Sequence, residues 1–175
     1  MSTNVAAFEI LYKEYYVRVF GLCRRILNSA ELAEDATQET FMRAYRNFKT
    51  YDSEMPFWRW IATIANRHCI DLLRQRGRNQ TLFGDEQEEM DNLASPEPQT
   101  LEQVIGAEDA VHLGAALGQM ADRYRVPLVL AYFAEASYDQ IAAELDISRN
   151  HVGVLLLRAK QQLRLSLDKA HRTQS

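Results

Sequence analysis

The residues best able to do chemistry are gathered between Phe57 and Arg78, a stretch that holds three aromatic side chains and five arginines. Guanidinium groups bind phosphates, and unpaired bases stack on aromatic rings for about 1–3 kcal/mol each. The composition of this stretch therefore predicts a nucleic-acid-binding surface.

The spacing of the apolar residues in the same stretch predicts that it is an α-helix. Apolar side chains recur at steps of three and four residues, which places them on one buried face: Ile61, Ile64, Ala65, Cys69, Leu72 and Leu73. Polar and basic side chains able to bind phosphates or base edges fall mainly on the other face: Arg59, Asn66, Arg67, Arg74 and Gln75.

Two tryptophans, Trp58 and Trp60, stand at the start of this helix, just after Pro56. A separated strand could stack its bases on such rings. A tryptophan at the start of an amphipathic helix is as often a large core residue. Each ring could therefore stack on a base or belong to the core. Both interpretations can hold, with one tryptophan in each role.

The order of residues in this helix resembles a known family. Trp60-Ile61-Ala62, Ile64-Ala65-Asn66 and Asp71-Leu72-Leu73-Arg74 are similar to the region-2 helix of bacterial RNA polymerase sigma factors of the extracytoplasmic-function (ECF) group. The resemblance implies that this helix opens and reads the −10 promoter element. The DNA-binding residues would be Trp58, Trp60, Asn66, Arg67 and Arg74.

Residues 49–56 connect this helix to the one before it, and their composition predicts a turn at Tyr51-Asp52-Ser53. In the resembling family a loop here captures a base flipped out of the −10 strand. Flipping costs a few kcal/mol, which stacking and hydrogen bonds must offset. We expect Tyr51 to stack on such a base and Asp52 to accept a hydrogen bond from its exocyclic amine.

Two further helices are expected earlier in the chain, at Ala6–Leu27 and from Ser29, as N-cap, to about Phe48. The sequence from Ala33 to Phe41 resembles the segment with which sigma factors dock on the coiled coil of the polymerase clamp. Helical geometry places an acidic flank outward, with Leu32, Ala36, Phe41 and Tyr45 able to face inward. The resemblance implies that core polymerase contacts Asp35, Gln38, Glu39, Phe41 and Met42. Without it, this flank would be read as a solvated face.

The C-terminal part of the chain predicts a helix-turn-helix. Ser137 and Gln140 form a capping box, and Ser148 is a good N-cap, so two helices should meet at Asp146-Ile147. The pattern resembles sigma region 4, which reads the −35 element. The residues expected to contact that element are Ser148, Arg149, Asn150, His151 and Arg158.

The outward face of the recognition helix is expected to be apolar. Plotted at helical spacing, Val152, Leu156, Ala159 and Leu163 face the core, whereas Asn150, Val154 and Leu157 point outward. Gly153 also lowers helix propensity by about 1 kcal/mol relative to Ala. Thymine methyl groups or a partner protein could cover this face. We therefore expect an anti-sigma factor to contact Val154 and Leu157.

Charge divides the chain into three parts. The net charge is −4, but residues 1–79 carry 12 basic and 9 acidic side chains, and residues 104–175 carry 8 of each. Residues 80–103 carry 7 acidic and no basic side chains and include Ser95-Pro96-Glu97-Pro98. Few glycines and prolines occur elsewhere. We expect an all-α protein of two small helical domains, region 2 at 1–79 and region 4 at 104–175, joined by an acidic linker at 80–103.

Other classes of function find less support. Cys23 and Cys69 have no paired spacing, and the four histidines are scattered, so neither a disulfide framework, a metal site nor an enzyme is expected, and no cofactor is implied. The sequence contains no apolar run of about 18 residues, the length that spans a membrane, and no charged-then-apolar leader pattern. Both observations favour a cytoplasmic protein. The leading interpretation is a sigma factor that binds core RNA polymerase and promoter DNA. The alternative is an operator-binding helix-turn-helix regulator acting as a dimer.

Overall fold

The computed structural model describes residues 2–77, 83, 100–106 and 109–174, and among them helices and turns occur without any strand. The chain divides into two compact units, residues 1–76 and residues 77–175. The predicted all-α fold with two helical domains is confirmed. The predicted acidic linker, 80–103, lies outside the described residues except for Phe83 and residues 100–103.

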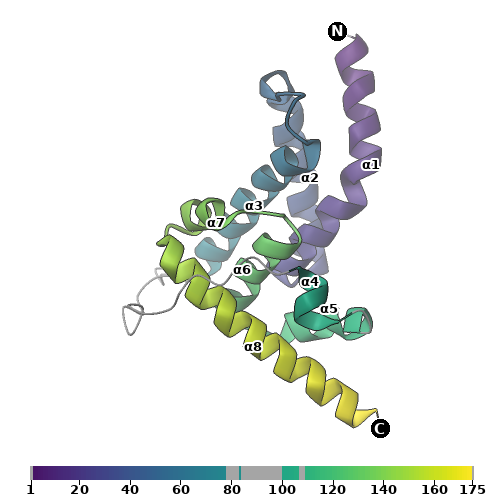
Figure 1. The fold of residues 1–175 in the computed structure, drawn as a ribbon. Coiled ribbons are helices and arrows are strands. Elements are labelled where there is room, and N and C mark those ends of the chain that lie inside the picture. Colours follow the sequence, from purple (N-terminus) through teal and green to yellow (C-terminus); the bar gives the residue numbers. More distant parts are fainter. Residues whose placement is uncertain (1, 78–82, 84–99, 107–108, 175) are drawn as a thin grey trace. The chain divides into compact units, whose positions relative to one another are not determined.

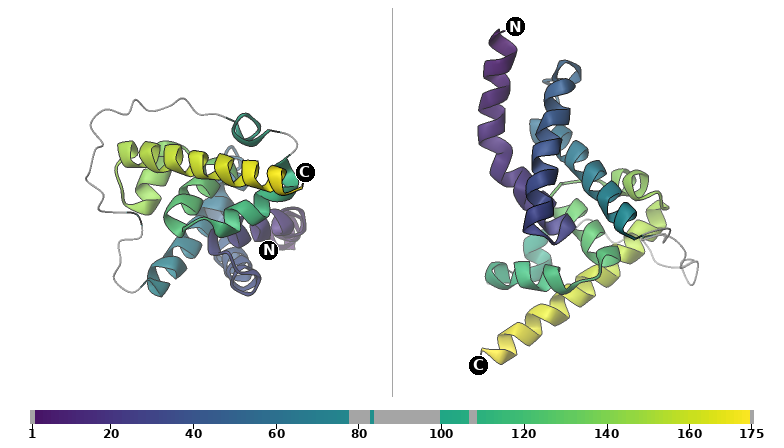
Figure 2. Two further views of the ribbon diagram at one scale, coloured as in Figure 1. Left: turned by 90° about the horizontal axis from the view of Figure 1, so that it is seen from below. Right: turned by 180° about the vertical axis from the view of Figure 1, so that it is seen from behind.

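The first unit is a bundle of three helices: α1 (Ser2–Leu27), α2 (Ala30–Arg46) and α3 (Phe57–Arg76). A short 3-10 helix, η1 (Phe48–Thr50), follows α2. Each of the three helices packs against the other two, and α1 and α2 run side by side in every view (Figures 1 and 2). Helix α3 is therefore covered by two neighbours rather than one.

The turn between α1 and α2 is tight because two residues close it. Asn28 adopts a left-handed backbone conformation with φ of 53°, which asparagine tolerates better than most residues. The Ser29 hydroxyl oxygen then accepts a hydrogen bond from the backbone N–H of Leu32 at 3.3 Å. Ser29 is thus the N-cap that the sequence predicts.

Helix α1 begins before the predicted Ala6, because its first residues extend the helix without adding to the apolar pattern.

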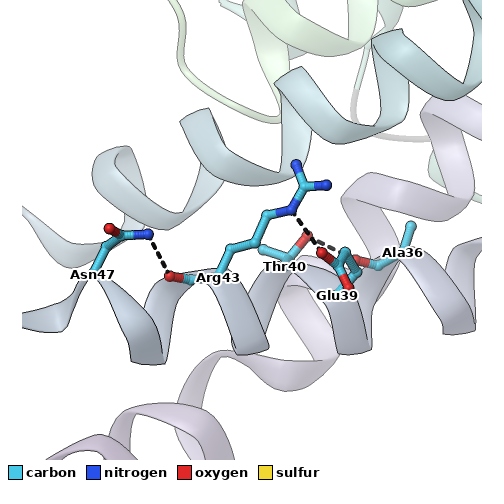
Figure 3. Close-up of polar contacts among 5 residues, drawn as sticks. All are labelled: Ala36, Glu39, Thr40, Arg43 and Asn47. Atoms are coloured by element: carbon cyan, nitrogen blue, oxygen red, sulfur yellow. Dashed lines mark hydrogen bonds and ion pairs between the residues drawn. The ribbon is translucent and has the colours of Figure 1, made fainter.

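Apart from Phe41, the buried side chains of α2 are small. None of these residues is exposed to solvent: Ala33, Ala36, Thr37, Thr40 and Ala44. The Thr37 hydroxyl donates to the carbonyl of Ala33 at 2.6 Å. In the same way the Thr40 hydroxyl donates to the carbonyl of Ala36 at 2.7 Å, as Figure 3 shows. Their polar atoms are satisfied within the helix. Neighbouring helices can therefore approach α2 closely.

The two cysteines meet in the core of the first unit. Cys23 on α1 and Cys69 on α3 are fully buried free thiols whose side chains hydrogen-bond each other. The hydrogen bond with Cys23, together with burial, raises the pKa of Cys69 well above its ordinary value. Cys69 therefore stays protonated and acts as a small core residue.

The second unit is organised around its last helix. It contains α4 (Leu101–Ile105), α5 (Ala110–Gln119), α6 (Asp122–Tyr132), α7 (Tyr138–Leu145) and the long α8 (Arg149–Thr173). Helix α8 packs against all four of the others, and α6 also packs against α7 (Figure 1). The predicted core positions Val152, Leu156, Ala159 and Leu163 are all buried.

Helices α7 and α8 form the predicted helix-turn-helix. The Ser137 hydroxyl accepts from the Gln140 N–H at 3.2 Å, while the Gln140 side chain accepts from the Ser137 N–H at 2.8 Å. Asp146 ends α7 in a left-handed conformation, with φ of 56°. The Ser148 hydroxyl oxygen accepts from the His151 N–H at 3.1 Å and starts α8. Local hydrogen bonds thus fix both ends of the turn.

In the part of the chain that the structure describes, no helix combines the length and the apolar character needed to cross a lipid bilayer.

Candidate functional site

The outer flank of α2 is exposed, acidic at one end and basic at the other. Asp35, Gln38 and Met42 are exposed, and Met42 keeps 50% of its surface open. Glu39 is half-buried and accepts a hydrogen bond from Arg43 Nε at 2.7 Å (Figure 3). This hydrogen bond lowers the pKa of Glu39 below its ordinary value. Glu39 is therefore an ionised group already held by a neighbour on its own helix.

Phe41 does not belong to this exposed flank. Its ring is only 3% exposed and contacts Phe8, Tyr12 and Tyr16 of α1. The expectation that Phe41 lies on the contact surface for polymerase is corrected: it faces α1, because α2 is packed on that helix along this side. The inward position also predicted for Phe41 is confirmed. Tyr45, predicted to face inward, is instead 52% exposed.

A cavity of about 420 Å³ opens between α1 and α2 beside the exposed flank. Its lining is mostly aromatic: Phe8, Tyr12, Gln38, Phe41, Met42, Tyr45 and Arg46. Sequence reasoning missed the part that α1 plays in it. Phe8 and Tyr12 are four residues apart, and such aromatic pairs lie on one helix face, but only the packing of α2 shows what that face meets.

An aromatic cluster surrounds the start of α3, on the side predicted to bind the −10 element. The Tyr51 ring lies 5.1 Å from Trp60 and 6.0 Å from Phe48, centroid to centroid. The Tyr51 hydroxyl donates to the carbonyl of Met55 at 2.5 Å, and Asp52 accepts from the Glu54 N–H at 3.0 Å. The predicted loop residues therefore shape the loop itself. Trp60 remains half-buried, with part of its ring accessible.

Trp58 is a core residue in this structure. It is 4% exposed, stacks on Tyr15 at 6.4 Å with an interplanar angle of 14°, and carries the Arg18 guanidinium 3.8 Å from its ring centroid. The prediction of an open stacking surface at Trp58 is wrong for this conformation, because the ring packs onto α1. Of the two tryptophans, only Trp60 presents an accessible ring.

Asn66 is also buried, contrary to its predicted place on the polar face. It is 2% exposed, and its Oδ1 atom has no hydrogen-bond partner. It lies in one helical row with Ala62 and Ile70, both buried, and α3 is covered by two helices, so the buried stripe is wider than the apolar pattern predicts. Arg67 and Arg74 are exposed as expected.

The predicted DNA-reading end of α8 is divided between exposed and buried side chains. Arg149 and Asn150 are exposed, and Ser148 caps the helix. Arg158 is half-buried. His151 is only 7% exposed, so its predicted contact with a base is not available in this conformation.

The expected apolar outward face of α8 is not present. Val154 is only 6% exposed, and Leu157 is half-buried. A helical wheel assumes one buried face, whereas α8 contacts four helices of its own unit. This corrects the prediction that an anti-sigma factor contacts Val154 and Leu157. At Gly153, a Cβ atom would meet no heavy atom within 4 Å beyond its own helix and chain neighbours.

In the described residues, no group of three or more His, Cys, Asp and Glu side chains is arranged to hold a metal ion.

Comparison with known proteins connects this geometry to a family. The family model "Sigma-70 region 2" matches residues 11–79, and "Sigma-70, region 4" matches residues 111–163. The ECF RNA polymerase sigma factor SigW of Bacillus subtilis is 31% identical over 173 residues, covering 92% of this chain and 89% of that protein. SigE of Mycolicibacterium smegmatis, another ECF sigma factor, is 30% identical over 165 residues, covering 93% of this chain and 62% of that protein.

A solved structure shares the fold. The sigma factor RpoE of Bartonella quintana, crystallised with the anti-sigma factor NepR, matches with a TM-score of 0.61 at 18% identity. The match covers 93% of this chain and 97% of that one. With both sigma regions present in order and the relative SigW matched over almost its whole length, the chain belongs to the ECF family of RNA polymerase sigma factors.

Proposed function

We propose that this sigma factor binds core RNA polymerase through the outer flank of α2 and directs it to a bipartite promoter. The −10 element would be read by α3 with the loop before it, and the −35 element by α8. Family membership supports the overall activity. The assignment of surfaces is argued from the exposed residues of each unit.

Docking on α2 is favoured by its exposure and charge. Asp35, Gln38 and Met42 are open to solvent, and Glu39 is ionised beside them. An exposed carboxylate such as Asp35 attracts basic side chains on a partner and excludes acidic ones. Met42 adds apolar surface that a partner can bury. Phe41 supports this flank from behind and is not itself part of the contact.

Reading of the −10 element is favoured by the accessible part of α3. Arg59, Arg67 and Arg74 are exposed and can bind phosphates of the separated strand. Trp60 and Tyr51 lie side by side and form an aromatic surface for bases. Asp52 can take part only if it gives up its hydrogen bond to the Glu54 N–H.

Reading of the −35 element is favoured by the helix-turn-helix geometry. The N-terminal end of the second helix enters the major groove in such proteins, and here that end presents Arg149 and Asn150. Arginine pairs with guanine and asparagine with adenine. The exposed Ser148 hydroxyl can donate a hydrogen bond to a phosphate while its oxygen caps α8.

The observation that carries the proposal is that the chain contains, in addition to the helix-turn-helix unit, a separate bundle with acidic side chains on the outside of α2 and basic side chains on the outside of α3. An operator-binding dimer needs only the helix-turn-helix unit, so that alternative leaves the bundle unexplained. The Bartonella relative was crystallised with an anti-sigma factor, and we propose that a partner of this kind holds the present chain inactive.

The test is binding to purified core polymerase, measured by gel filtration and by transcription from a candidate promoter. We expect the chain to elute with core, and Asp35→Arg to weaken that association while leaving the circular-dichroism spectrum unchanged. Tight, sequence-specific binding of the free chain to operator DNA, with no binding to core, contradicts the proposal.

A further inference from the structure

Two thiols from different helices meet in the core of the first unit. Cys23 on α1 and Cys69 on α3 are both completely shielded from solvent, and their side chains hydrogen-bond each other. They are far apart in sequence, and they are the only two cysteines of the chain. A disulfide within this chain can therefore join only these two residues, and the fold already places them in contact.

A third helix contributes to the surroundings of Cys23. The Thr37 hydroxyl of α2 hydrogen-bonds the Cys23 side chain, so this thiol lies where the three helices meet. The hydrogen bond with Cys69 lowers the pKa of Cys23 below its ordinary value, an effect that burial opposes and Thr37 assists. The same thiol–thiol hydrogen bond, together with burial, raises the pKa of Cys69. Thiolate character is therefore concentrated on Cys23.

This unequal pair has the two parts that disulfide formation needs. The thiolate is the form of cysteine that attacks an oxidant, and a neighbouring thiol then displaces the oxidised group. Cys23 supplies the attacking sulfur, and Cys69 supplies the second thiol at contact distance. A buried cysteine without such a partner acts only as a small apolar residue.

We propose that Cys23 and Cys69 form an oxidation site, at which a hydroperoxide produces a reversible disulfide between α1 and α3. The Cys23 sulfur attacks the peroxide bond, which gives a sulfenic acid and releases water or an alcohol. The Cys69 sulfur then attacks the Cys23 sulfur and displaces one water molecule. The two thiols together lose two protons and two electrons, which reduce the peroxide, and a small dithiol reverses the change.

The burial of both thiols determines when the site reacts and what the disulfide does. Neither sulfur is exposed in the folded bundle, so the oxidant reaches Cys23 when the helices separate locally. Once formed, the disulfide closes a loop that contains all of α2. A cross-link of this kind restricts the unfolded chain, so oxidation stabilises the first unit.

The experiment treats the reduced whole chain with hydrogen peroxide under native conditions, blocks the remaining thiols in denaturant and maps the unreduced peptides by mass spectrometry. We expect the Cys23 peptide to be linked to the Cys69 peptide, and dithiothreitol to restore both thiols. Two unmodified thiols, sulfinic acid in place of the disulfide, or linkage only between separate chains would overturn the proposal.

Thermal unfolding tests the effect of the cross-link. Both tryptophans of the chain lie in the first unit, so their fluorescence reports the unfolding of that unit. The midpoint should be higher in the oxidised chain than in the reduced one, and dithiothreitol should return it to the lower value. A lower midpoint after oxidation would contradict the proposed stabilisation.

Single serine variants test the two roles, because serine keeps a hydrogen-bonding group of similar size at each position. In Cys69→Ser, dimedone should trap Cys23 as a sulfenic acid, since no thiol remains to displace it. In Cys23→Ser, Cys69 should react with peroxide about tenfold more slowly, since the more protonated thiol is the poorer nucleophile. Equal rates would contradict the assigned roles. If circular dichroism shows that a variant does not fold, the peptide map of the unaltered chain decides the proposal alone.

Discussion

The guanidinium of Arg149, the first residue of α8, lies 2.8 Å from a carboxylate oxygen of Asp139 on α7. Both side chains are exposed, and the Arg149 guanidinium also lies 5.8 Å from the ring centroid of Tyr138. The residue proposed to read guanine is therefore already paired across the helix-turn-helix. Reading a base requires Arg149 to leave Asp139, or to contact both.

The first prediction concerns this competition. Asp139→Asn should strengthen binding of the holoenzyme to its −35 element by about two- to fivefold, because an exposed ion pair is worth at most about 1 kcal/mol. Arg149→Ala should weaken the same binding. Fluorescence anisotropy with a labelled promoter fragment measures both, and Asp168→Asn, another exposed carboxylate on α8, is the control. Weaker binding of Asp139→Asn would show that the pair holds Arg149 in its reading position.

The second prediction separates two neighbours on α8. Asn150 is exposed, whereas His151 is 7% exposed. Asn150→Ala should cost about 1–3 kcal/mol of discrimination at one base pair and leave stability unchanged. His151→Ala should instead lower thermal stability without changing which base is preferred. Binding to a panel of single-base promoter variants distinguishes the two, and a changed base preference in His151→Ala would contradict the assignment.

The third prediction separates the two tryptophans. Trp58→Ala should destabilise the first unit by about 3–5 kcal/mol, because it removes a buried ring from beneath Arg18 and Tyr15. Trp60→Ala should leave core binding intact and slow promoter opening. Permanganate reactivity of unpaired thymines reports the opening, and chemical denaturation reports the stability. Equal losses of both properties in the two variants would mark Trp60 as purely structural.

The fourth prediction concerns Gly153. Because an added Cβ meets open space there, Gly153→Ala should stabilise the second unit by about 0.5–1 kcal/mol. Thermal denaturation measures the gain. If the same variant binds promoter DNA more weakly, the glycine is retained for a close approach of the DNA. A decrease in stability would show that α8 has no room at this position.

The fifth prediction concerns pH. Burial, and secondarily the nearby Arg43, lower the pKa of His68 on α3 below its ordinary value, while Glu39 and Asp71 oppose the shift. The folded state therefore favours the neutral imidazole. The stability that the neutral His68 side chain contributes is fully present above the ordinary pKa of histidine. It is lost as the pH falls from that value through the lower pKa of the folded state. Urea denaturation at about pH 7.5 and about pH 5.5 should show a loss of stability that is smaller in His68→Gln.

Local patterns predicted the helices and their ends well. Ser29, Ser137 and Ser148 were identified as caps from their own neighbours in sequence, and each side chain accepts the expected backbone hydrogen bond. Capping is decided within three residues, so sequence alone carries the information.

Exposure was predicted less well wherever a helix has more than one neighbour. Asn66 and Val154 were placed outward because a helical wheel assumes one buried face. Helix α3 has two packing partners and α8 has four, so additional faces are covered. The cavity between α1 and α2 could not be predicted for the same reason, since its lining comes from residues far apart in sequence that only packing brings together.

The small residues on the inner face of α2 have a consequence for how promoter opening is controlled. Ala33, Thr37 and Ala44 are small and fully buried, and Phe41 is packed among the rings of α1, so α2 lies tightly against the rest of the bundle. Close-packed interiors transmit displacement instead of absorbing it. If polymerase binds the outside of α2, as proposed, the orientation of α3 is set by the same rigid unit. The enzyme, rather than any flexibility of the sigma factor, would then direct the angle at which the reading helix meets the DNA.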